Sequence, residues 1–242
     1  MDGSCIKIGQ QAPDFSANST FGPVCLEDYK GKWLILFSHP GDFTPVCTTE
    51  FIAFAKLHPE FEKRKACLLG LSIDSNPSHL AWVYNIMKNT GVQIPFPIIS
   101  DRNGAIAMRY GMMPSSGDFT TVRTVFIIDP EGKIRATLMY PSSSGRNIPE
   151  ILRLVDALQI SDKEKVVTPA NWMPGQAVLV PPPTTYEALL DRVNNSQAQG
   201  LSCMDWYLCF KNPSEDKAEK KEEKKVEEVV EERNYIVRKK QE

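Results

Sequence analysis

The residues best suited to chemistry lie in one short segment around Cys47. Residues 38–47 read SHPGDFTPVC and directly follow an apolar run from Trp33 to Phe37. An apolar run of this length predicts a buried strand, and Thr44 followed by Pro45 predicts the N-cap and the first residue of a helix. Cys47 then lies in the opening helical turn, where unpaired backbone N–H groups and the helix dipole favour a thiolate.

Cys47 has no partner cysteine close to it in the sequence. A Cys-x-x-Cys dithiol would need a second cysteine at position 44 or 50, where the chain has Thr44 and Glu50. We therefore expect Cys47 to react first on its own. The alternative is that Cys47 is an inert small hydrophobe and that Thr44 is nothing more than a helix cap.

The pattern Pro-x-x-x-Thr-x-x-Cys, formed by Pro40, Thr44 and Cys47, resembles the active-site motif of the peroxiredoxins. These are thiol peroxidases built on a thioredoxin-like fold. The wider string HPGDFTPVCTTE, residues 39–50, is similar to that of their 1-Cys branch, also called the peroxiredoxin 6 type. The similarity extends from about Ile8 to Phe210, and includes VRTVFIID over residues 122–129 and GRN over residues 145–147.

Peroxide reduction by a thiolate sets three requirements. The sulfur must stay anionic, the peroxide must be oriented, and the charge that grows on the departing oxygen must be stabilised. The resemblance implies that Cys47 attacks hydrogen peroxide or a small alkyl hydroperoxide. It also implies that Thr44 hydrogen-bonds the peroxide, and that Arg123 stabilises the thiolate and polarises the substrate.

Further residues are expected to support this site. The resemblance implies that Pro40 belongs to the active-site loop and that Glu50 and Arg146 hold the Arg123 guanidinium. It places His39 near the sulfur, by packing or by a hydrogen bond, and it implies no cofactor and no metal. From residue types alone, two alternatives stay open: Arg123 could flank a strand with its head in water, and His39 could be structural.

Two late cysteines separate sub-types of the family. Residues 202–210 read SCMDWYLCF, which resembles the Cys-x-Asp-Trp-x-x-Cys element of archaeal-type members. The resemblance implies that Cys209, from a neighbouring chain, resolves the oxidised Cys47, with Cys203 assisting or exchanging. A thioredoxin-like or other thiol reductant would then reset the pair. Half of a zinc site and purely structural burial are the alternatives for these two cysteines.

Composition sets the outer bounds. The chain has 242 residues and a formal net charge of −2, which gives no reason to expect nucleic acid or an anionic membrane as a partner. Met1 to Gln10 contains no apolar signal core, and no apolar stretch is long enough to span a bilayer, so we expect a cytoplasmic protein. The remaining cysteines, Cys5, Cys25 and Cys67, are expected to be structural. Of these, Cys67 is expected to be buried.

Apolar runs alternate with helical patterns along the chain, which predicts an α/β fold. We expect strands over residues 33–38, 68–73, 97–100, 124–129 and 134–140, the last two forming an antiparallel hairpin. Helices are expected to include Cys47 and to cover residues 78–89, 149–158 and 186–193. These elements predict a mixed sheet flanked by helices. The family resemblance implies that the sheet is thioredoxin-like and that a small C-terminal domain follows it.

The expected domain bounds follow the composition. A peroxidase domain is predicted over residues 1–165, a small C-terminal domain over 166–212, and a charged tail, helical or disordered, over 213–242. Family resemblance implies a homodimer, with a decameric ring of dimers as a further possibility. The alternative function is a redox-dependent holdase chaperone assembly. A thioredoxin-like disulfide reductase is disfavoured by the missing Cys-x-x-Cys.

Overall fold

The computed structural model describes residues 6–115 and 119–213, in two compact units that divide between Gln159 and Ile160. Cys5 and nearly all of the expected charged tail lie outside the described residues. The structure does not test the domain bounds predicted from composition, which stay predictions.

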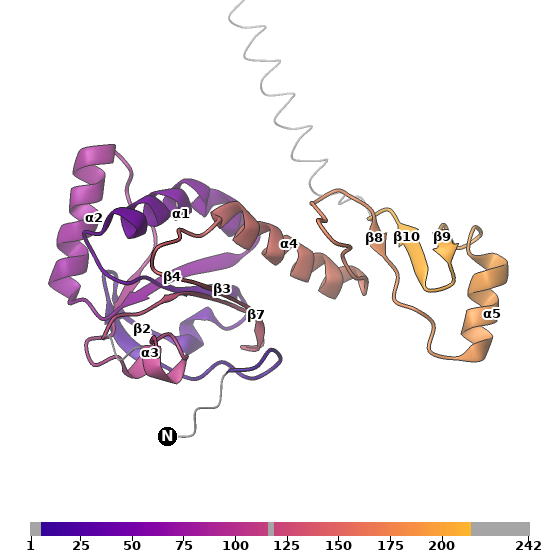
Figure 1. The fold of residues 1–242 in the computed structure, drawn as a ribbon, viewed down its shortest axis with the longest axis horizontal. Helices are drawn as coiled ribbons and strands as arrows, with labels where there is room; N and C mark the ends of the chain where they lie inside the picture. The colour runs from indigo at the N-terminus through magenta and orange to yellow at the C-terminus, as the bar shows by residue number, and fades with distance from the viewer. Residues whose placement is uncertain (1–5, 116–118, 214–242) are drawn as a thin grey trace, which may run out of the picture. The chain divides into compact units, whose positions relative to one another are not determined.

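The larger unit is built on a mixed sheet, which Figure 1 shows with its flanking helices. The strand order is β2-β1-β5-β4-β3-β6-β7. Strand β3 pairs in parallel with β4 and antiparallel with β6, so it lies at the junction of the two halves of the sheet. The strands have the following bounds: β1 Ser16–Ser19, β2 Gly22–Cys25, β3 Trp33–Ser38, β4 Ala66–Ser72, β5 Ile98–Ser100, β6 Arg123–Ile128 and β7 Ile134–Tyr140. The expected mixed sheet and the antiparallel β6–β7 hairpin are confirmed.

Helices cover both faces of this sheet. Their bounds are α1 Pro45–Lys63, α2 Asn76–Thr90, α3 Ala105–Arg109 and α4 Ile148–Glu164, with a 3-10 turn η1 at Leu26–Tyr29. Helix α2 begins two residues earlier than expected, and it ends before Gly91 as its sequence predicts. The Ser75 hydroxyl accepts from the Ser78 N–H at its start, and Gly91, with φ 73°, ends it in the left-handed conformation. Among the described helices, none combines the length and the apolar character that a bilayer crossing requires.

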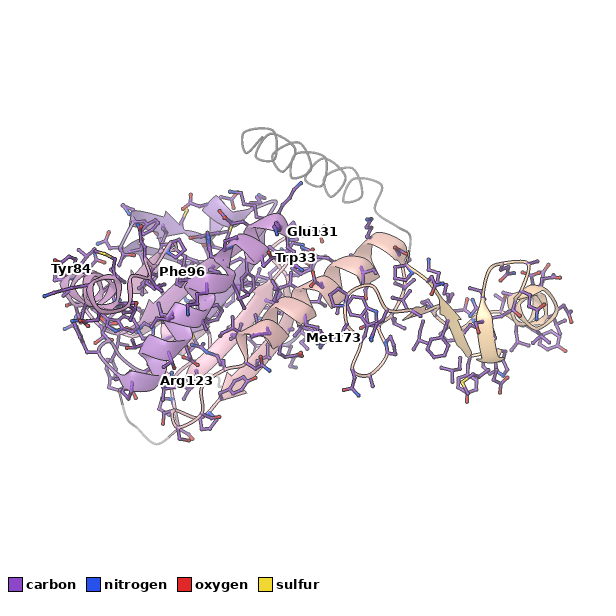
Figure 2. All side chains as sticks on the ribbon, turned by 90° about the horizontal axis from the view of Figure 1, so that it is seen from above. Trp33, Tyr84, Phe96, Arg123, Glu131 and Met173 are labelled. Carbon is purple, nitrogen blue, oxygen red and sulfur yellow. A yellow bond between two sulfur atoms is a disulfide. The ribbon has the colours of Figure 1, made fainter. Side chains whose placement is uncertain are left out.

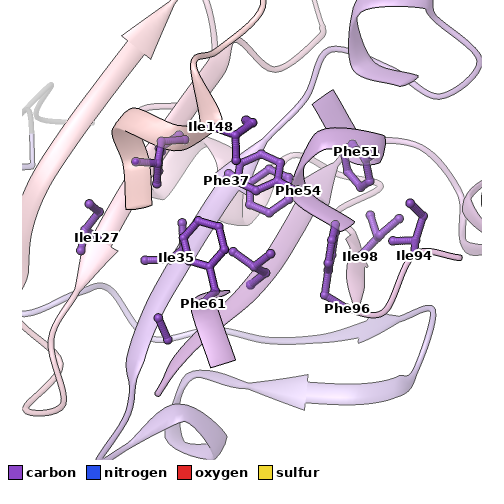
Figure 3. Close-up of a cluster of buried hydrophobic side chains, with 14 of the residues drawn as sticks. Ile35, Phe37, Phe51, Phe54, Phe61, Ile94, Phe96, Ile98, Ile127 and Ile148 are labelled. Atoms are coloured by element: carbon purple, nitrogen blue, oxygen red, sulfur yellow. The ribbon is translucent and has the colours of Figure 1, made fainter. Parts of the chain in front are cut away.

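Two apolar clusters fill the space between helices and sheet. Because neighbouring side chains of a strand point to opposite faces, Ile35 and Phe37 belong to one cluster while Leu34 and Leu36 belong to the other. The first cluster lies under α1, α2 and α4 and is rich in aromatic rings (Figure 3). Its Phe37 ring stacks on Phe54 with the centroids 4.2 Å apart. Strand β3 is therefore anchored on both faces, which fixes the loop that leaves its end.

Several features differ from the sequence prediction. The β1–β2 hairpin was not expected, because its strands have only 4 residues each and show no apolar period. Strand β6 begins at Arg123, one residue earlier than expected, so this arginine is part of the sheet. Cys67 in β4 is partly exposed, and the expectation that it is buried was wrong. Its neighbours Ala66 and Leu68 face the aromatic cluster, whereas Cys67 packs at the margin of the other cluster, near the start of β4.

The smaller unit contains a second sheet with the order β8-β10-β9. Its elements are β8 Val178–Leu179, α5 Tyr186–Asn195, β9 Ser202–Asp205 and β10 Leu208–Lys211. The predicted helix over residues 186–193 is confirmed, and the Thr185 hydroxyl caps it by accepting from the Ala188 N–H. The strands had not been predicted, since they are too short to show a period in the sequence.

Candidate active site

Cys47 lies in the first turn of α1, and its side chain is fully buried. The preceding loop runs from the end of β3 to Thr44, and Pro45 opens the helix as predicted. Thr44 occupies the N-cap position, but its side chain does not cap the helix, so that part of the prediction was wrong. Its hydroxyl donates instead to the Gly41 carbonyl at 2.8 Å. The partial positive charge of the helix end therefore stays uncompensated by the cap and favours an anionic sulfur.

Arg123 brings a guanidinium to this sulfur from the first residue of β6. Its Nη1 lies 3.3 Å from Cys47 Sγ and 2.8 Å from Glu50 Oε2. On the other side, Nε and Nη2 donate to the Ser142 carbonyl at 3.1 and 2.8 Å. The residue is 2% exposed, so the alternative in which its head lies in water does not hold. In Figure 2 it lies at the end of the sheet opposite Trp33.

The Glu50 carboxylate accepts hydrogen bonds from both Arg123 and Arg146. Its Oε1 accepts from the backbone N–H and Nε of Arg146 at 2.8 and 2.9 Å, and its Oε2 accepts from Arg146 Nη2 at 2.7 Å. The Arg146 Nη1 donates to the Ser38 carbonyl at 2.9 Å, at the end of β3. The same guanidinium lies over the Phe37 ring, 5.2 Å from its centroid. A charge this deeply buried is held by hydrogen bonds on its edge and aromatic rings on its faces.

The charges of this cluster do not balance without the sulfur. Burial alone would raise the pKa of Glu50, but hydrogen bonds and charge from Arg146, with the charge of Arg123, lower it below its ordinary value of 4.5. Glu50 is therefore ionised and compensates one of the two guanidiniums. One buried positive charge remains, and a Cys47 thiolate is the group in contact with it that can neutralise it.

The Arg123 guanidinium also keeps a donor for a ligand. An arginine side chain carries five N–H donors. The bonds to Cys47, Glu50 and Ser142 use the Nε–H, both Nη1–H groups and one Nη2–H. Among the described residues, no acceptor engages the second Nη2–H. A peroxide oxygen bound beside the sulfur could accept it.

His39 belongs to a buried hydrogen-bonded cluster that the sequence did not predict. Its Nε2 lies 3.0 Å from Asp42 Oδ1, and its ring stacks on Trp82 with the centroids 5.1 Å apart. The other oxygen of Asp42 lies 2.9 Å from His79 Nδ1. The spacing of His79 with the apolar Trp82 on one face of α2 was the available signal for a buried histidine. The expected role of His39 beside the sulfur stays a prediction.

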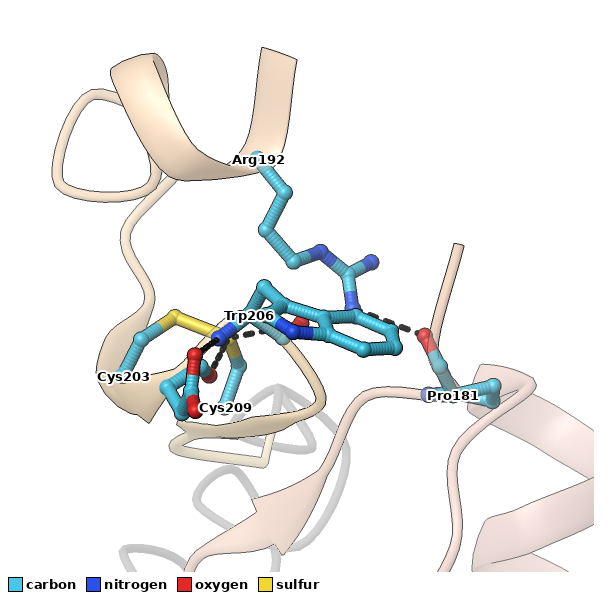
Figure 4. Close-up of a disulfide and its surroundings, with 6 residues drawn as sticks. Pro181, Arg192, Cys203, Trp206 and Cys209 are labelled. Atoms are coloured by element: carbon cyan, nitrogen blue, oxygen red, sulfur yellow. Dashed lines mark hydrogen bonds between the residues drawn. A yellow bond between two sulfur atoms is a disulfide. The ribbon is translucent and has the colours of Figure 1, made fainter. Parts of the chain in front are cut away.

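The two late cysteines form an intrachain disulfide in the smaller unit (Figure 4). It joins β9 to β10, where Cys203 and Cys209 are register partners, and the Cys209 side chain is fully buried. Trp206 lies in the turn between them and is partly exposed. A disulfide has no free thiol, so this pair must be reduced before either cysteine can act as a nucleophile.

Comparison with known proteins covers most of the chain. Residues 8–137 match the model of the AhpC/TSA family, and residues 157–195 match the C-terminal domain of 1-Cys peroxiredoxin. Among curated proteins, the chain is 60% identical over 206 residues to "Peroxiredoxin 2" of Caldanaerobacter subterraneus subsp. tengcongensis, covering 85% of this chain and 92% of the relative. It is 52% identical over 217 residues to "Peroxiredoxin" of Aquifex aeolicus, covering 85% and 96%.

Solved structures agree with these relatives. A yeast mitochondrial 1-Cys peroxiredoxin, whose structure concerns thiol resolution through glutathione and thioredoxin systems, is 43% identical with a TM-score of 0.76, covering 86% of this chain and 99% of that one. A mutant of peroxiredoxin 6 from Arenicola marina is 34% identical with a TM-score of 0.77, covering 87% and 100%.

Proposed function

We propose that this chain, which belongs to the peroxiredoxin family and is a thiol peroxidase, uses Cys47 to reduce hydrogen peroxide and small alkyl hydroperoxides. The Cys47 thiolate attacks the terminal peroxide oxygen, the O–O bond breaks, and the sulfur becomes a sulfenic acid. The sulfur is oxidised by two electrons. The departing oxygen takes up a proton and leaves as water or as an alcohol.

Each neighbouring side chain has a role in this step. Arg123 stabilises the thiolate and directs its remaining Nη2–H at the peroxide, where it opposes the charge that grows on the departing oxygen. Thr44 orients the peroxide from the loop that contains Pro40. Glu50 and Arg146 keep the Arg123 guanidinium in place. The observation that carries the proposal is the 3.3 Å contact between Arg123 Nη1 and Cys47 Sγ, in a cluster with one uncompensated positive charge.

The late cysteines complete the cycle. The Cys209 thiol, from a neighbouring chain, attacks the Cys47 sulfenic sulfur, forms a disulfide and releases water. The Cys203 thiolate then attacks the Cys209 sulfur and releases the Cys47 thiolate. This exchange leaves the Cys203–Cys209 disulfide that the structure contains. A thioredoxin-like or other dithiol reductant supplies the two electrons that reopen it.

Intact-mass analysis after one equivalent of peroxide tests this sequence. In the Cys209→Ser variant we expect Cys47 to gain about 16 Da, one oxygen, and further peroxide to carry it up the oxidation ladder. The reduced protein with all its cysteines should instead lose two hydrogens and form the Cys203–Cys209 disulfide through an interchain intermediate. Cys67→Ser is the matched control and should behave as the parent. An oxygen adduct in a Cys47→Ser variant would contradict the assignment.

The partners follow from this cycle. We propose a homodimer, with a decameric ring of dimers as its higher assembly, a thioredoxin-like reductant, and a cytoplasmic location. The holdase alternative is separated by the Cys47→Ser variant, which should abolish peroxide reduction. If that variant protected an unfolding client protein as the parent does, holdase activity would be independent of Cys47 chemistry.

A further inference from the structure

The larger unit contains a second set of buried titratable side chains, beside the one formed by Cys47, Glu50, Arg123 and Arg146. It consists of His39, Asp42 and His79, and we call it the histidine cluster. Both histidines are fully buried, and the Asp42 side chain is 1% exposed. Two of its members, His39 and Asp42, lie in the loop between β3 and α1, whereas His79 projects from α2. The cluster therefore ties the loop that carries Thr44 to the neighbouring helix.

The protonation state of His79 follows from its hydrogen-bond partners. Its Nδ1 lies 3.0 and 2.9 Å from the two carboxylate oxygens of Asp42. Its Nε2 lies 3.2 Å from the carbonyl oxygen of Ile99 in β5. A carboxylate and a carbonyl can only accept, so each ring nitrogen must donate. A neutral imidazole has a single N–H, and both bonds form only when His79 is an imidazolium.

His39 differs from His79 in one respect. Its Nε2 faces Asp42 Oδ1 at 3.0 Å and must donate as well, but its Nδ1 is buried and has no hydrogen-bond partner among the described residues. A second proton at Nδ1 would have no acceptor and no solvent, so the neutral form is favoured. In agreement with this, burial lowers the pKa of His39 by more than its hydrogen bond to Asp42 raises it.

We propose that His79 is a buried imidazolium paired with the Asp42 carboxylate, and that this pair fixes His39 as the neutral tautomer with its proton on Nε2. Asp42 and His79 are then positioning residues for the active-site loop. The pair balances its own charge, so it adds no net charge next to the Cys47 cluster. The lone pair of His39 Nδ1 stays free at neutral pH.

The groups around the Asp42–His79 pair are consistent with a positive charge on His79. From the loop after β4, Asp74 Oδ2 accepts from the Asp42 backbone N–H at 3.1 Å and from the Ser72 hydroxyl at 2.8 Å. From β5, the pair meets the Ile99 carbonyl. From α2, Trp82 covers His39 with an uncharged ring. Burial alone would raise the pKa of Asp42, but the hydrogen bonds from His39 and His79 lower it below its ordinary value, so Asp42 is a carboxylate.

Nitrogen-15 magic-angle-spinning NMR of the sedimented full-length protein, labelled in histidine alone, tests the assignment. The chain contains 3 histidines, and a His58→Gln variant removes the signals of the third. At about pH 7 and at about pH 8.5 we expect two protonated nitrogens on one histidine, His79, and a single protonated nitrogen on the other. Neutral signals from both buried histidines would overturn the proposal. A copurified metal ion bound by the three side chains would overturn it too.

Two variants extend the test to function, and this part rests on the proposed peroxidase cycle. In Asp42→Asn, the amide oxygen can accept from one histidine, but the amide nitrogen donates to the other and carries no negative charge. This variant should therefore leave His79 neutral. It should also slow peroxide oxidation of Cys47 by about 10- to 100-fold, as expected when a reacting group is displaced slightly. Asp74→Asn is the matched control, because an amide oxygen can still accept from the Asp42 N–H, and it should keep the parental spectrum.

In His79→Gln, the amide can replace the donors but not the charge. The Asp42 carboxylate then has no counter-charge, and His39 no longer faces the positive charge of His79, which lowers the pKa of His39 in the parent. The pKa of His39 should therefore rise, and despite the missing acceptor at Nδ1 His39 should gain more of a second proton than in the parent as the pH falls from about 8.5 to about 6. Peroxide oxidation should acquire the same pH dependence. If His39 stayed as neutral as in the parent over this range, the claim that the Asp42–His79 pair sets the protonation state of His39 would be refuted. The spectra could behave as expected while Asp42→Asn reacts with peroxide at the parental rate, and this result would refute the positioning role. A parent protein without peroxidase activity would refute the proposed function alone.

Discussion

Glu50 and Arg146 meet through two parallel side-chain hydrogen bonds of 2.9 and 2.7 Å, fully enclosed by the protein. The same Glu50 carboxylate accepts from Arg123 at 2.8 Å, which links the buried pair to the reactive sulfur. A carboxylate that serves two guanidiniums sets the position of both. The geometry around the sulfur therefore depends on a carboxylate that holds both guanidiniums.

Replacing Glu50 by Gln should damage both stability and activity. The amide keeps the shape but removes the charge, so two guanidiniums are left buried with no carboxylate between them. Breaking a buried pair in this way is expected to lower the free energy of unfolding by about 3–5 kcal/mol. Urea denaturation of the variant and the parent measures this difference. Peroxide oxidation of Cys47 should slow as Arg123 loses its anchor. Glu27→Gln is the control, because the Glu27–Lys30 pair is exposed and its loss should change the unfolding free energy little.

Replacing Arg123 by Lys tests whether the shape of the cation matters. An ammonium keeps the charge but cannot contact Cys47, Glu50 and Ser142 at once, as the guanidinium does. The loss of a charged hydrogen bond, about 1.5–3 kcal/mol, predicts a roughly 10- to 100-fold slower alkylation of Cys47 by iodoacetamide at pH 7. The exposed Arg102→Lys variant should react at the parental rate. An unchanged rate in Arg123→Lys would show that charge alone activates the sulfur.

Acid should destabilise the protein through Glu50. Because its folded-state pKa lies below the ordinary 4.5, the carboxylate stabilises the fold fully above that pH. The contribution is lost as the pH falls through the folded-state pKa, where the native state must take up the proton. The unfolding free energy of the parent should therefore decrease between about pH 5 and about pH 3. The Glu50→Gln variant should show a flatter profile over the same interval, and an equally steep one would contradict this explanation.

Gly70 in β4 is predicted to resist enlargement. A β-carbon there would lie 3.2 Å from Phe51 Cζ and 3.5 Å from Ile98 Cγ2, inside the packed aromatic cluster. Since the Phe51 ring also packs against His39, 4.8 Å between centroids, it has little room to move. We expect Gly70→Ala to cost about 1–3 kcal/mol in unfolding free energy. Gly41→Ala, whose β-carbon would make ordinary contacts at 3.8 Å, should cost less.

Much of the fold was predictable from local patterns. The run from Trp33 to Ser38 is a strand because its apolar residues alternate between two clusters, and Pro45 begins a helix because its ring suits the first turn. The β1–β2 hairpin was missed because its short strands are stabilised by pairing with each other and with β5 rather than by an apolar period. Tertiary contact decided these strands, and a single sequence does not display it.

The candidate site was likewise predictable only in part. Cys47, Arg123, Glu50 and Arg146 are brought together in the structure, and a family resemblance had named all four. Their specific partners were not predictable, because the bond from Arg123 to the Ser142 carbonyl depends on the backbone path of the loop between β7 and α4. The histidine cluster was missed for a related reason. Three polar residues separated by up to 40 positions become neighbours only when α2 packs on the loop after β3.

The wide sequence separation of the groups around Cys47 has a consequence during protein synthesis. The sulfur is translated long before the guanidiniums at positions 123 and 146 that surround it in the finished fold. Until those residues have left the ribosome and packed against α1, Cys47 lacks both guanidiniums. We therefore expect the thiol to become reactive only after β6 and the loop before α4 have been synthesised and folded onto it.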